Sequence, residues 1–210
     1  MYEILLILLG YLYGSIPFAL VIGKVFYNTD VRESGSGNLG GTNAGRVLGK
    51  KAGISVIVLD ALKAVIIFYL SSYLSLKFNL NPDIKYLAGL ACIFGHCYPI
   101  FAEFRGGKAV STSLGYFLCI EPLYAVVAIV VFLLVLKISK YVSLSSISTA
   151  LIVLCITPFL AVSITAKLCM LVAVILLVYR HKDNIKRIKN QTESKIQWKN
   201  ITKILNKQFL

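Results

Sequence analysis

The sequence predicts an all-α integral membrane protein with about seven transmembrane helices. Of its 210 residues 58% are hydrophobic, the mean hydropathy is +0.79, and the apolar runs are continuous. In lipid, only helices and closed barrels satisfy every backbone polar group, and barrel strands alternate apolar and polar side chains. Continuous runs therefore favour helices, and residues 1–210 are expected to form a single membrane domain.

Seven apolar runs are interpreted as spans. They cover residues 4–26, 52–76, 84–101, 109–120, 122–138, 142–161 and 163–180. Glu121-Pro122 separates the fourth run from the fifth, because proline favours the first turn of a helix and disrupts its interior. The fourth run is about 18 Å long, which is short for a span but tolerable beside a protein cavity. A five-span alternative with 109–136 undivided places Lys137 and Lys140 outside, against the positive-inside rule.

Basic residues set the predicted orientation. Residues 24–51 carry five of them, and residues 180–210 carry nine Lys and Arg against two acidic residues. Because cytoplasmic segments are rich in Lys and Arg, the amino terminus is expected outside and the carboxyl terminus in the cytoplasm. Residues 182–210 form a basic tail, in which 195–210 are expected to lie on anionic lipids as an amphipathic segment. Nucleic acid is not an expected partner, because the sequence has no aromatic and basic platform.

The five cysteines do not indicate a disulfide framework. They lie in or beside apolar runs at positions 92, 97, 119, 155 and 169, without a C-x-x-C pair, and we interpret them as small packing residues. Two histidines and nine scattered carboxylates are too few for a multi-ligand metal cage. A bound metal is therefore not expected.

The most informative stretch is Ser34–Lys51, a glycine-rich polar loop between the first two spans. Its glycines, among them Gly37 and Gly40, permit positive φ and close backbone approach, so successive N–H groups can converge on one anion. Arg46 adds a planar guanidinium suited to phosphate oxygens. Short polar donors are Ser36, Asn38, Thr42 and Asn43. A flexible linker is the alternative, but a linker needs no such regular Asn, Thr and Arg.

Asp60 and Lys63 place two charges inside the second span. Three residues apart, they share one helix face, about 12–17 Å from the cytoplasmic end. Each charge would cost on the order of 3 kcal/mol facing lipid, so both must face the protein interior. A buried pair that braces the floor of a site is favoured over direct catalysis, and Lys63 is a candidate contact of the substrate.

A second polar stretch covers residues 95–115. Its glycine turn leads into the amino terminus of a predicted helix, where N–H groups and the helix dipole favour an anion. The candidates are His96, Gly106, Gly107, Lys108, Ser111 and Thr112. A nucleotide P-loop does not fit, because it needs Gly at 102 and Ser or Thr at 109, and both are Ala. The alternative is a pair of basic side chains that extend to lipid headgroups.

The last polar motif follows the final span and contains His181 and Asn184. On a continuous helix these residues lie one turn apart on one face, so they can present an imidazole and an amide to the same cavity. The alternative is a solvated basic face on which both are incidental.

The three polar motifs are predicted to meet at the cytoplasmic face. Their basic side chains could balance more than one phosphate, so we expect phosphorylated substrates. At least one substrate should carry an acyl chain, because the site opens into lipid. Transfer of an already activated acyl group fits, since the protein then mainly positions two anions and stabilises the developing oxyanion.

These motifs resemble the bacterial membrane-embedded glycerol-3-phosphate acyltransferases that use acyl-phosphate as donor. The resemblance covers most of the chain. It is carried by Gly14-Ser-Ile-Pro17, GSGNLGGTNAGRVLG (35–49), Asp60-Ala-Leu-Lys63, GHCYPIFAEFRGGKA (95–109), Ser111-Thr112 and His181-Lys-Asp-Asn184. It implies seven helices in the bacterial cytoplasmic membrane and acyl transfer to the 1-hydroxyl of glycerol 3-phosphate, which yields lysophosphatidic acid and phosphate for phospholipid synthesis without a cofactor.

The resemblance also implies roles and partners. The catalytic set would be Ser36, Arg46, Lys108, His181 and Asn184. The substrate-binding set would be Gly37, Asn38, Gly40, Thr42, Asn43, Lys63, His96, Gly106, Gly107, Ser111 and Thr112. The expected partners are acyl-phosphate, glycerol 3-phosphate, membrane lipids and the soluble enzyme that makes acyl-phosphate.

Three residues depart from the family pattern. Gly41, Ala64 and Ala109 stand where the family usually has Ala, Gly and Gly. A methyl group at 109 should be harmless if that residue is helical and damaging if its φ is positive.

Two questions stay open at this point. The general base is either His181, whose unperturbed pKa is suitable, or a substrate phosphate with a second pKa of about 6. We hypothesise that the substrate phosphate takes the proton.

A transporter of phosphorylated solutes is a competing function, which would show flux without product. A CDP-alcohol phosphotransferase would need a D-x-x-D cluster, and other glycerolipid acyltransferases a His-x4-Asp pattern, and the sequence has neither.

Overall fold

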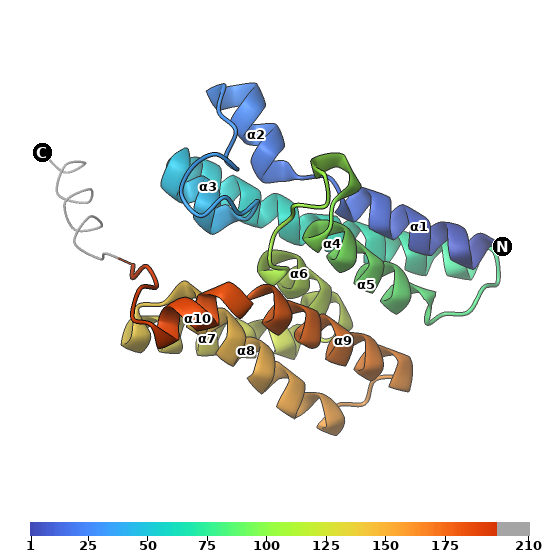
Figure 1. Ribbon diagram of the computed structural model, residues 1–210. Coiled ribbons are helices and arrows are strands. Elements are labelled where there is room, and N and C mark those ends of the chain that lie inside the picture. The colour runs from blue at the N-terminus through green and yellow to red at the C-terminus, as the bar shows by residue number, and fades with distance from the viewer. Residues whose placement is uncertain (197–210) are drawn as a thin grey trace, which may run out of the picture.

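The computed structural model describes residues 1–196, and within them all regular structure is helical (Figure 1). In chain order the helices are α1 (Tyr2–Gly14), α2 (Phe18–Tyr27), α3 (Gly41–Val47), α4 (Lys50–Lys77), α5 (Ile84–Cys97), η1 (Ile100–Ala102), α6 (Val110–Ile120), α7 (Pro122–Ser139), α8 (Val142–Ile156), η2 (Thr157–Phe159), α9 (Ile164–Arg180) and α10 (Lys182–Lys189). The predicted all-α class is confirmed. Most of the amphipathic segment predicted at 195–210 lies outside the described residues.

Within residues 1–196, five helical segments are long and apolar enough to cross a membrane. They are α1 with α2, α4, α5 with η1, α7, and α8 with η2. A sixth is added when α9 and α10, which meet at a bend of 49°, are counted together. The one predicted span that remains is 109–120, which corresponds to α6. Its 11 residues extend only about 17 Å. Seven crossings therefore stay a prediction.

Local sequence explains two breaks between helices. Pro17 has φ −90° and ψ 81° and separates α1 from α2. Glu121 is extended, its carboxylate accepts a hydrogen bond from the Leu123 N–H, and Pro122 occupies the first turn of α7, as expected for the start of a helix. The predicted division of 109–138 into two helices is confirmed.

The glycine-rich stretch 34–51 is not a loop throughout. Its second half forms α3, and α4 begins at Lys50. Gly35 and Gly37 have positive φ, at 64° and 66°. Gly45 instead permits close packing of α3 on α4. A Cβ added to Gly53 of α4 would lie 2.7 Å from the Cα of Gly45. The glycines thus serve both local turns and helix contact, and the expectation of a wholly irregular loop is wrong.

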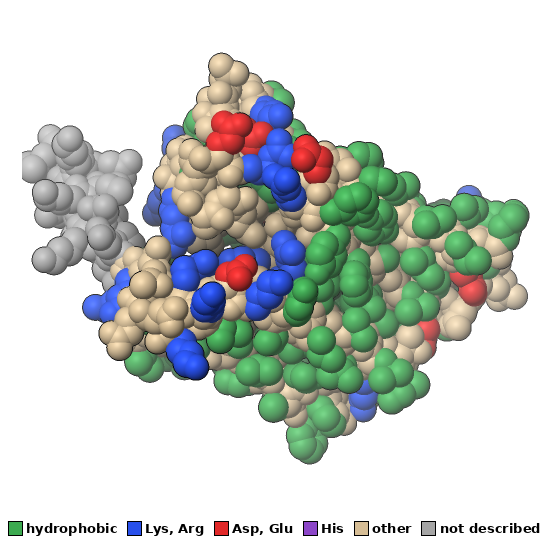
Figure 2. Space-filling model, in the orientation of Figure 1, with side chains coloured by type: hydrophobic (Ala, Val, Ile, Leu, Met, Phe, Trp, Pro, Cys, Tyr) green, Lys and Arg blue, Asp and Glu red, His purple; other side chains and the backbone are tan. Residues whose placement is uncertain are grey.

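The helices form two halves joined through α6 (Figure 1). One half contains α1, α4 and α5, with α2 and α3 at its end, and the other contains α7 to α10. Met1 lies at the end of the bundle opposite α3 and α10. Lys and Arg side chains gather around α10 and the α2–α3 region, while hydrophobic side chains cover much of the remaining surface (Figure 2). This distribution is typical of a bundle whose sides face lipid.

The contact between α1 and α5 gives a testable prediction. A Cβ on Gly14 would clash with the Cys92 carbonyl oxygen. Gly14→Val should therefore lower the Tm in detergent by about 5 °C or more, since over-packing costs roughly 1–3 kcal/mol. Leu12→Val is the matched control, because Leu12 is exposed on the same helix. Equal melting temperatures for the Gly14 variant and the control would contradict this packing.

Candidate active site

A cavity of about 780 Å³ lies where the three polar motifs come together. Eleven of the sixteen predicted site residues line it: Ser36, Asn38, Gly40, Thr42, Asn43, Arg46, His96, Lys108, Ser111, His181 and Asn184. The remaining wall is largely apolar and comes from α6, α7 and α8, with Leu114, Phe117, Ile129, Phe132 and Leu133 among its residues. The cavity thus joins a polar, basic region to an apolar one.

Asn43 holds the first polar motif in shape. Its side chain is buried, and its Oδ1 accepts a hydrogen bond from the Ser36 N–H at 2.7 Å. Its Nδ2 donates to the carbonyl oxygens of Val31 and Ser34, at 2.9 and 3.2 Å. These three hydrogen bonds fix Ser36 at the cavity wall. Asn43, predicted to bind substrate, therefore acts in this structure as the anchor of the loop.

The second polar motif is held from both sides. Asn38 donates from Nδ2 to the Gly106 carbonyl oxygen at 3.3 Å. Arg180 donates from Nη2 to the same oxygen and from Nε to the Gly107 carbonyl oxygen, both at 3.0 Å. The Gly107 N–H donates to the His96 carbonyl oxygen at 3.0 Å, and a Cβ on Gly107 would clash with the His96 ring. The two glycines therefore shape the wall without lining the cavity.

Ala109 adopts the left-handed conformation, with φ 65° and ψ 7°, immediately before α6. This is the case in which a side chain is strained, at a cost of about 1 kcal/mol. The methyl group is fully buried in the main apolar core, and this burial offsets part of the cost. The loop thus keeps the geometry expected of glycine at this position.

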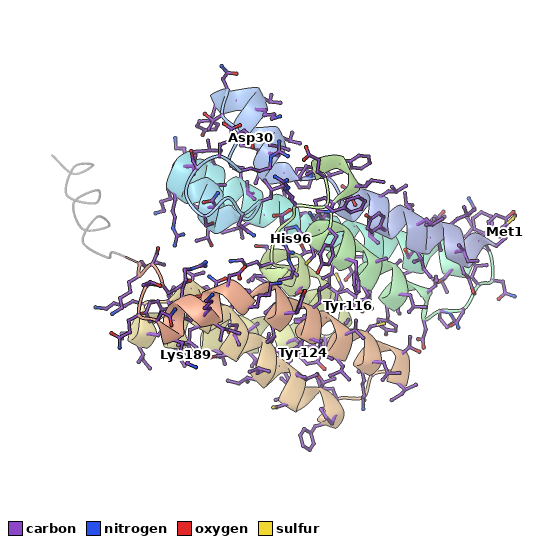
Figure 3. All side chains as sticks on the ribbon, viewed as in Figure 1. Met1, Asp30, His96, Tyr116, Tyr124 and Lys189 are labelled. Atoms are coloured by element: carbon purple, nitrogen blue, oxygen red, sulfur yellow. The ribbon has the colours of Figure 1, made fainter. Side chains whose placement is uncertain are left out.

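Lys63 lies beside the cavity rather than on its wall. Its Nζ is 2.8 Å from Asp60 Oδ1 and 3.0 Å from His96 Nδ1, and it donates to the Ile16 carbonyl oxygen at 3.3 Å. Asp60 Oδ1 also lies 3.4 Å from His96 Nδ1, so the three side chains form one buried polar cluster. His96 lies where the two halves of the bundle approach each other (Figure 3). This geometry agrees with a buried brace and gives Lys63 no direct access to substrate.

Two other predicted residues also lie off the cavity wall. Thr112 is fully buried, and its hydroxyl has no hydrogen-bond partner within residues 1–196. Gly37 turns the first motif through its positive φ. Both residues therefore contribute to the shape of the loops that carry the lining residues.

A polar network extends from Lys108 across the mouth of the cavity. Lys108 Nζ donates to Asn184 Oδ1 at 2.5 Å, and Asn184 Nδ2 donates to Glu193 Oε1 at 2.6 Å. Glu193 also accepts from Ser143 Oγ and from Arg187 Nε, both at 2.7 Å. The network joins the loop before α6 to α8, to α10 and to the segment that follows α10, around the same cavity.

Three further residues that the sequence did not predict line the cavity: Ser143, Arg187 and Glu193. Arg187 follows Asn184 by three residues, so helical spacing could have indicated it. Ser143 and Glu193 meet only through the folded chain, and no local pattern identifies them.

His181, with φ −98° and ψ 7°, lies between α9 and α10, which meet at a bend of 49°. The chain therefore bends at His181, but the Ile185 N–H donates to the His181 carbonyl oxygen at 2.9 Å, so His181 and Asn184 lie within one helical turn at the start of α10. Both residues line the cavity. His181 Nδ1 lies 2.8 Å from the Leu177 carbonyl oxygen. Since a carbonyl only accepts, Nδ1 carries a proton, and Nε2 of the neutral ring is an acceptor.

The surroundings of Lys108 change how readily its side chain carries a charge. Burial lowers the pKa of Lys108 to about 8, and the nearby guanidinium of Arg187 acts in the same direction, whereas the Glu193 carboxylate opposes both. An anion bound beside Lys108 would favour the charged form. The site can therefore gain a full positive charge as a phosphate binds.

Comparison with known proteins identifies the family. The profile of glycerol-3-phosphate acyltransferases matches residues 4–191. The chain belongs to this family. Glycerol-3-phosphate acyltransferases of Geobacillus kaustophilus and Listeria monocytogenes serovar 1/2a are 50% and 52% identical to it, over 92% and 93% of this chain and 96% and 97% of theirs.

Solved structures agree with this assignment. The acyltransferase is similar to PlsY (YgiH), an integral membrane glycerol 3-phosphate acyltransferase, in its glycerol 3-phosphate form, with a TM-score of 0.88 and 33% identity. The similarity covers 96% of this chain and 99% of that one. The lysophosphatidic acid form gives a TM-score of 0.84. The chain is therefore a membrane glycerol-3-phosphate acyltransferase, and the resemblance read from its motifs is confirmed at this level.

The pKa of Lys108 gives a second prediction. The kcat/KM of this acyltransferase for glycerol 3-phosphate should fall as pH rises through about 8, because the neutral amine no longer attracts phosphate. Since kcat/KM reports the free enzyme, and bound phosphate favours the ammonium form, kcat should persist to higher pH. Lys108→Arg is the matched variant, because guanidinium stays charged. An unchanged alkaline limb in that variant would contradict the assignment.

Proposed function

We propose that the chain transfers an acyl group from acyl-phosphate to the sn-1 hydroxyl of glycerol 3-phosphate, giving lysophosphatidic acid and phosphate. The observation that carries this proposal is that one cavity joins a basic region to an apolar wall. Arg46, Lys108 and Arg187 line the basic region and could hold two phosphate groups. An acyl chain could lie along the wall formed by α6, α7 and α8.

Acyl-phosphate suits this site because its leaving group is itself a phosphate. The sn-1 oxygen attacks the acyl carbon, the bond from that carbon to the phosphate oxygen breaks, and phosphate departs with the electron pair. Negative charge grows on the carbonyl oxygen and on the departing phosphate. Fixed cations and N–H groups in the cavity would stabilise both charges.

We assign the individual roles by position. Ser36 and Arg46 would bind phosphate and the transition state from the first motif, and Asn38 and Thr42 would hold glycerol 3-phosphate beside them. Lys108, with Gly106 and Gly107 shaping its loop, would bind a phosphate from the second motif. Asn184 would keep the Lys108 ammonium in place through the 2.5 Å hydrogen bond between them. His96, Gly40 and Ser111 would complete the wall.

A substrate phosphate is proposed as the general base, with His181 in an orienting role. The Nδ1–H of His181 is held by the Leu177 carbonyl oxygen, so Nε2 can accept a hydrogen bond from a substrate. A phosphate has a second pKa of about 6 and can take the hydroxyl proton directly. The proton of the sn-1 hydroxyl is then held by a phosphate that is already bound in the site.

We also propose seven crossings in the bacterial cytoplasmic membrane, with α6 as a short one. The amino terminus would lie outside and the site at the cytoplasmic face. Met1 and α10 lie at opposite ends of the bundle, which supports an odd number of crossings. The exposed lysines of α10, Lys182, Lys186 and Lys189, would face anionic lipids and could contact the soluble enzyme that makes acyl-phosphate.

Turnover with defined donors tests the function. Purified protein in lipid, given acyl-phosphate and glycerol 3-phosphate, should release phosphate and form lysophosphatidic acid, whereas acyl-CoA should support no comparable rate. Ser36→Ala and Arg46→Ala should each lower kcat/KM about a hundredfold or more, because each removes a group bound to developing charge. Faster turnover with acyl-CoA would refute the donor, and solute flux without product would favour a transporter.

The same assay separates the two possible bases. His181→Gln keeps a hydrogen-bonding side chain of similar reach but cannot take a proton at neutral pH. Appreciable turnover of bound substrates by this variant supports the substrate phosphate. Complete loss of turnover with unchanged binding would make His181 the base.

A further inference from the structure

Arg180 ends α9 and touches the second polar motif. Its Nε and Nη2 donate to the carbonyl oxygens of Gly107 and Gly106, both at 3.0 Å. Its guanidinium carbon lies 5.0 Å from the centroid of the Tyr98 ring, and Tyr98 is in turn held through its carbonyl oxygen by the Tyr11 hydroxyl. Arg180 is not part of the cavity wall. Its side chain therefore contacts the loop rather than a substrate in the cavity.

The contact uses the geometry that distinguishes Arg from Lys. A guanidinium presents several N–H groups in one rigid plane, whereas an ammonium is a point charge on a flexible stem. Two adjacent carbonyl oxygens are bound here by two nitrogens of the same plane. The fork therefore fixes the orientation of two successive peptide groups, which a single contact would leave free to rotate.

The orientation of those peptides decides where their N–H groups point. In a trans peptide the C=O and N–H bonds point in opposite directions. The Gly106 carbonyl faces Arg180, and the N–H of the same peptide, on Gly107, donates to the His96 carbonyl oxygen. The Gly107 carbonyl also faces Arg180, so the N–H of Lys108 points away from it. This N–H finds no acceptor in the part of the chain that the structure describes, and Lys108 lines the cavity.

Charge strengthens this arrangement. A cation at the carbonyl end of a peptide polarises the group, so its N–H becomes a better donor to an anion at the other end. Arg180 can thus support anion binding from outside the cavity, without occupying space there. The first residues of α6, Val110 and Ser111, also line the cavity, and the N–H groups at the start of a helix favour an anion.

We propose that Arg180 is a positioning residue, which clamps the Gly106 and Gly107 carbonyls so that the Lys108 N–H and side chain face a substrate phosphate. This inference rests on the proposed function, because it assumes that residues 106–108 bind a phosphate of glycerol 3-phosphate or of acyl-phosphate. It assigns to a residue at the end of α9 a role in positioning the second motif.

Paired variants test the clamp. Arg180→Lys keeps the charge and loses the fork, and Arg180→Gln loses both. Each should raise KM for the substrate whose phosphate the loop holds about tenfold, with kcat within about threefold, because a binding contact is weakened before the chemical step. KM is measured separately for glycerol 3-phosphate and acyl-phosphate, and the substrate that responds identifies the phosphate held by the loop.

The matched control is Arg105→Gln. Arg105 precedes the same loop and is exposed, and its side chain makes no hydrogen bond or ion pair with another described residue, so this variant removes an equal charge without removing the clamp. It should leave both KM values within about twofold, since exposed charges are screened by solvent. If Arg105→Gln raised KM as much as Arg180→Gln does, the loss of positive charge alone would explain the effect, and the clamp would be contradicted.

Chemical rescue separates positioning from folding. In Arg180→Ala, added guanidinium ion should restore KM toward the wild-type value, while the Tm in detergent stays unchanged by the ion. Unaltered KM in folded Arg180→Gln, or loss of activity in every Arg180 variant without rescue, would overturn the proposal. Wild-type protein that does not acylate glycerol 3-phosphate from acyl-phosphate would instead overturn the proposed function.

Discussion

One carbonyl oxygen joins the three polar motifs. The Gly106 oxygen belongs to the second motif and accepts hydrogen bonds from Asn38 of the first and from Arg180 beside the third. At membrane depth an unpaired backbone group costs several kcal/mol, so irregular segments must satisfy one another. This constraint explains why loops far apart in sequence share one cavity. The Lys108–Asn184 hydrogen bond adds a second link between the same segments.

The charged side chains of the site lie next to an apolar wall, so each carboxylate in the cavity lining needs a partner. Asp60 is neutralised by Lys63 beneath the cavity, and Glu193 is held by Ser143, Asn184 and Arg187 at its mouth. Both carboxylates of the lining are therefore occupied by partners within the protein. Arg46 and Lys108, which make no ion pair with a described carboxylate, remain available to phosphate, while the wall from α6 to α8 provides an apolar surface for an acyl chain.

Periodicity and motif spacing predicted the helical class, the break at Glu121-Pro122 and the family. They did not predict α3, because seven residues rich in Gly and Asn carry a weak helical signal. The bend at His181 was also missed, since no proline or glycine marks it. Arg180 and Glu193 act through contacts between distant segments, which local patterns do not encode. The buried Asp60–Lys63 pair was predicted from its spacing, but only the fold shows that His96 contacts it.

The central claim is that the three polar motifs lie on one side of the membrane. It is tested most directly by labelling single cysteines with a membrane-impermeant thiol reagent in a variant whose native cysteines are replaced. Ser34→Cys, Arg105→Cys and Asp183→Cys place one exposed thiol beside each motif, and Asn81→Cys places one in the turn between α4 and α5. The account predicts that the first three are labelled from one side and Asn81→Cys from the other. Labelling of any of the three from the side that reaches Asn81→Cys would contradict a shared site.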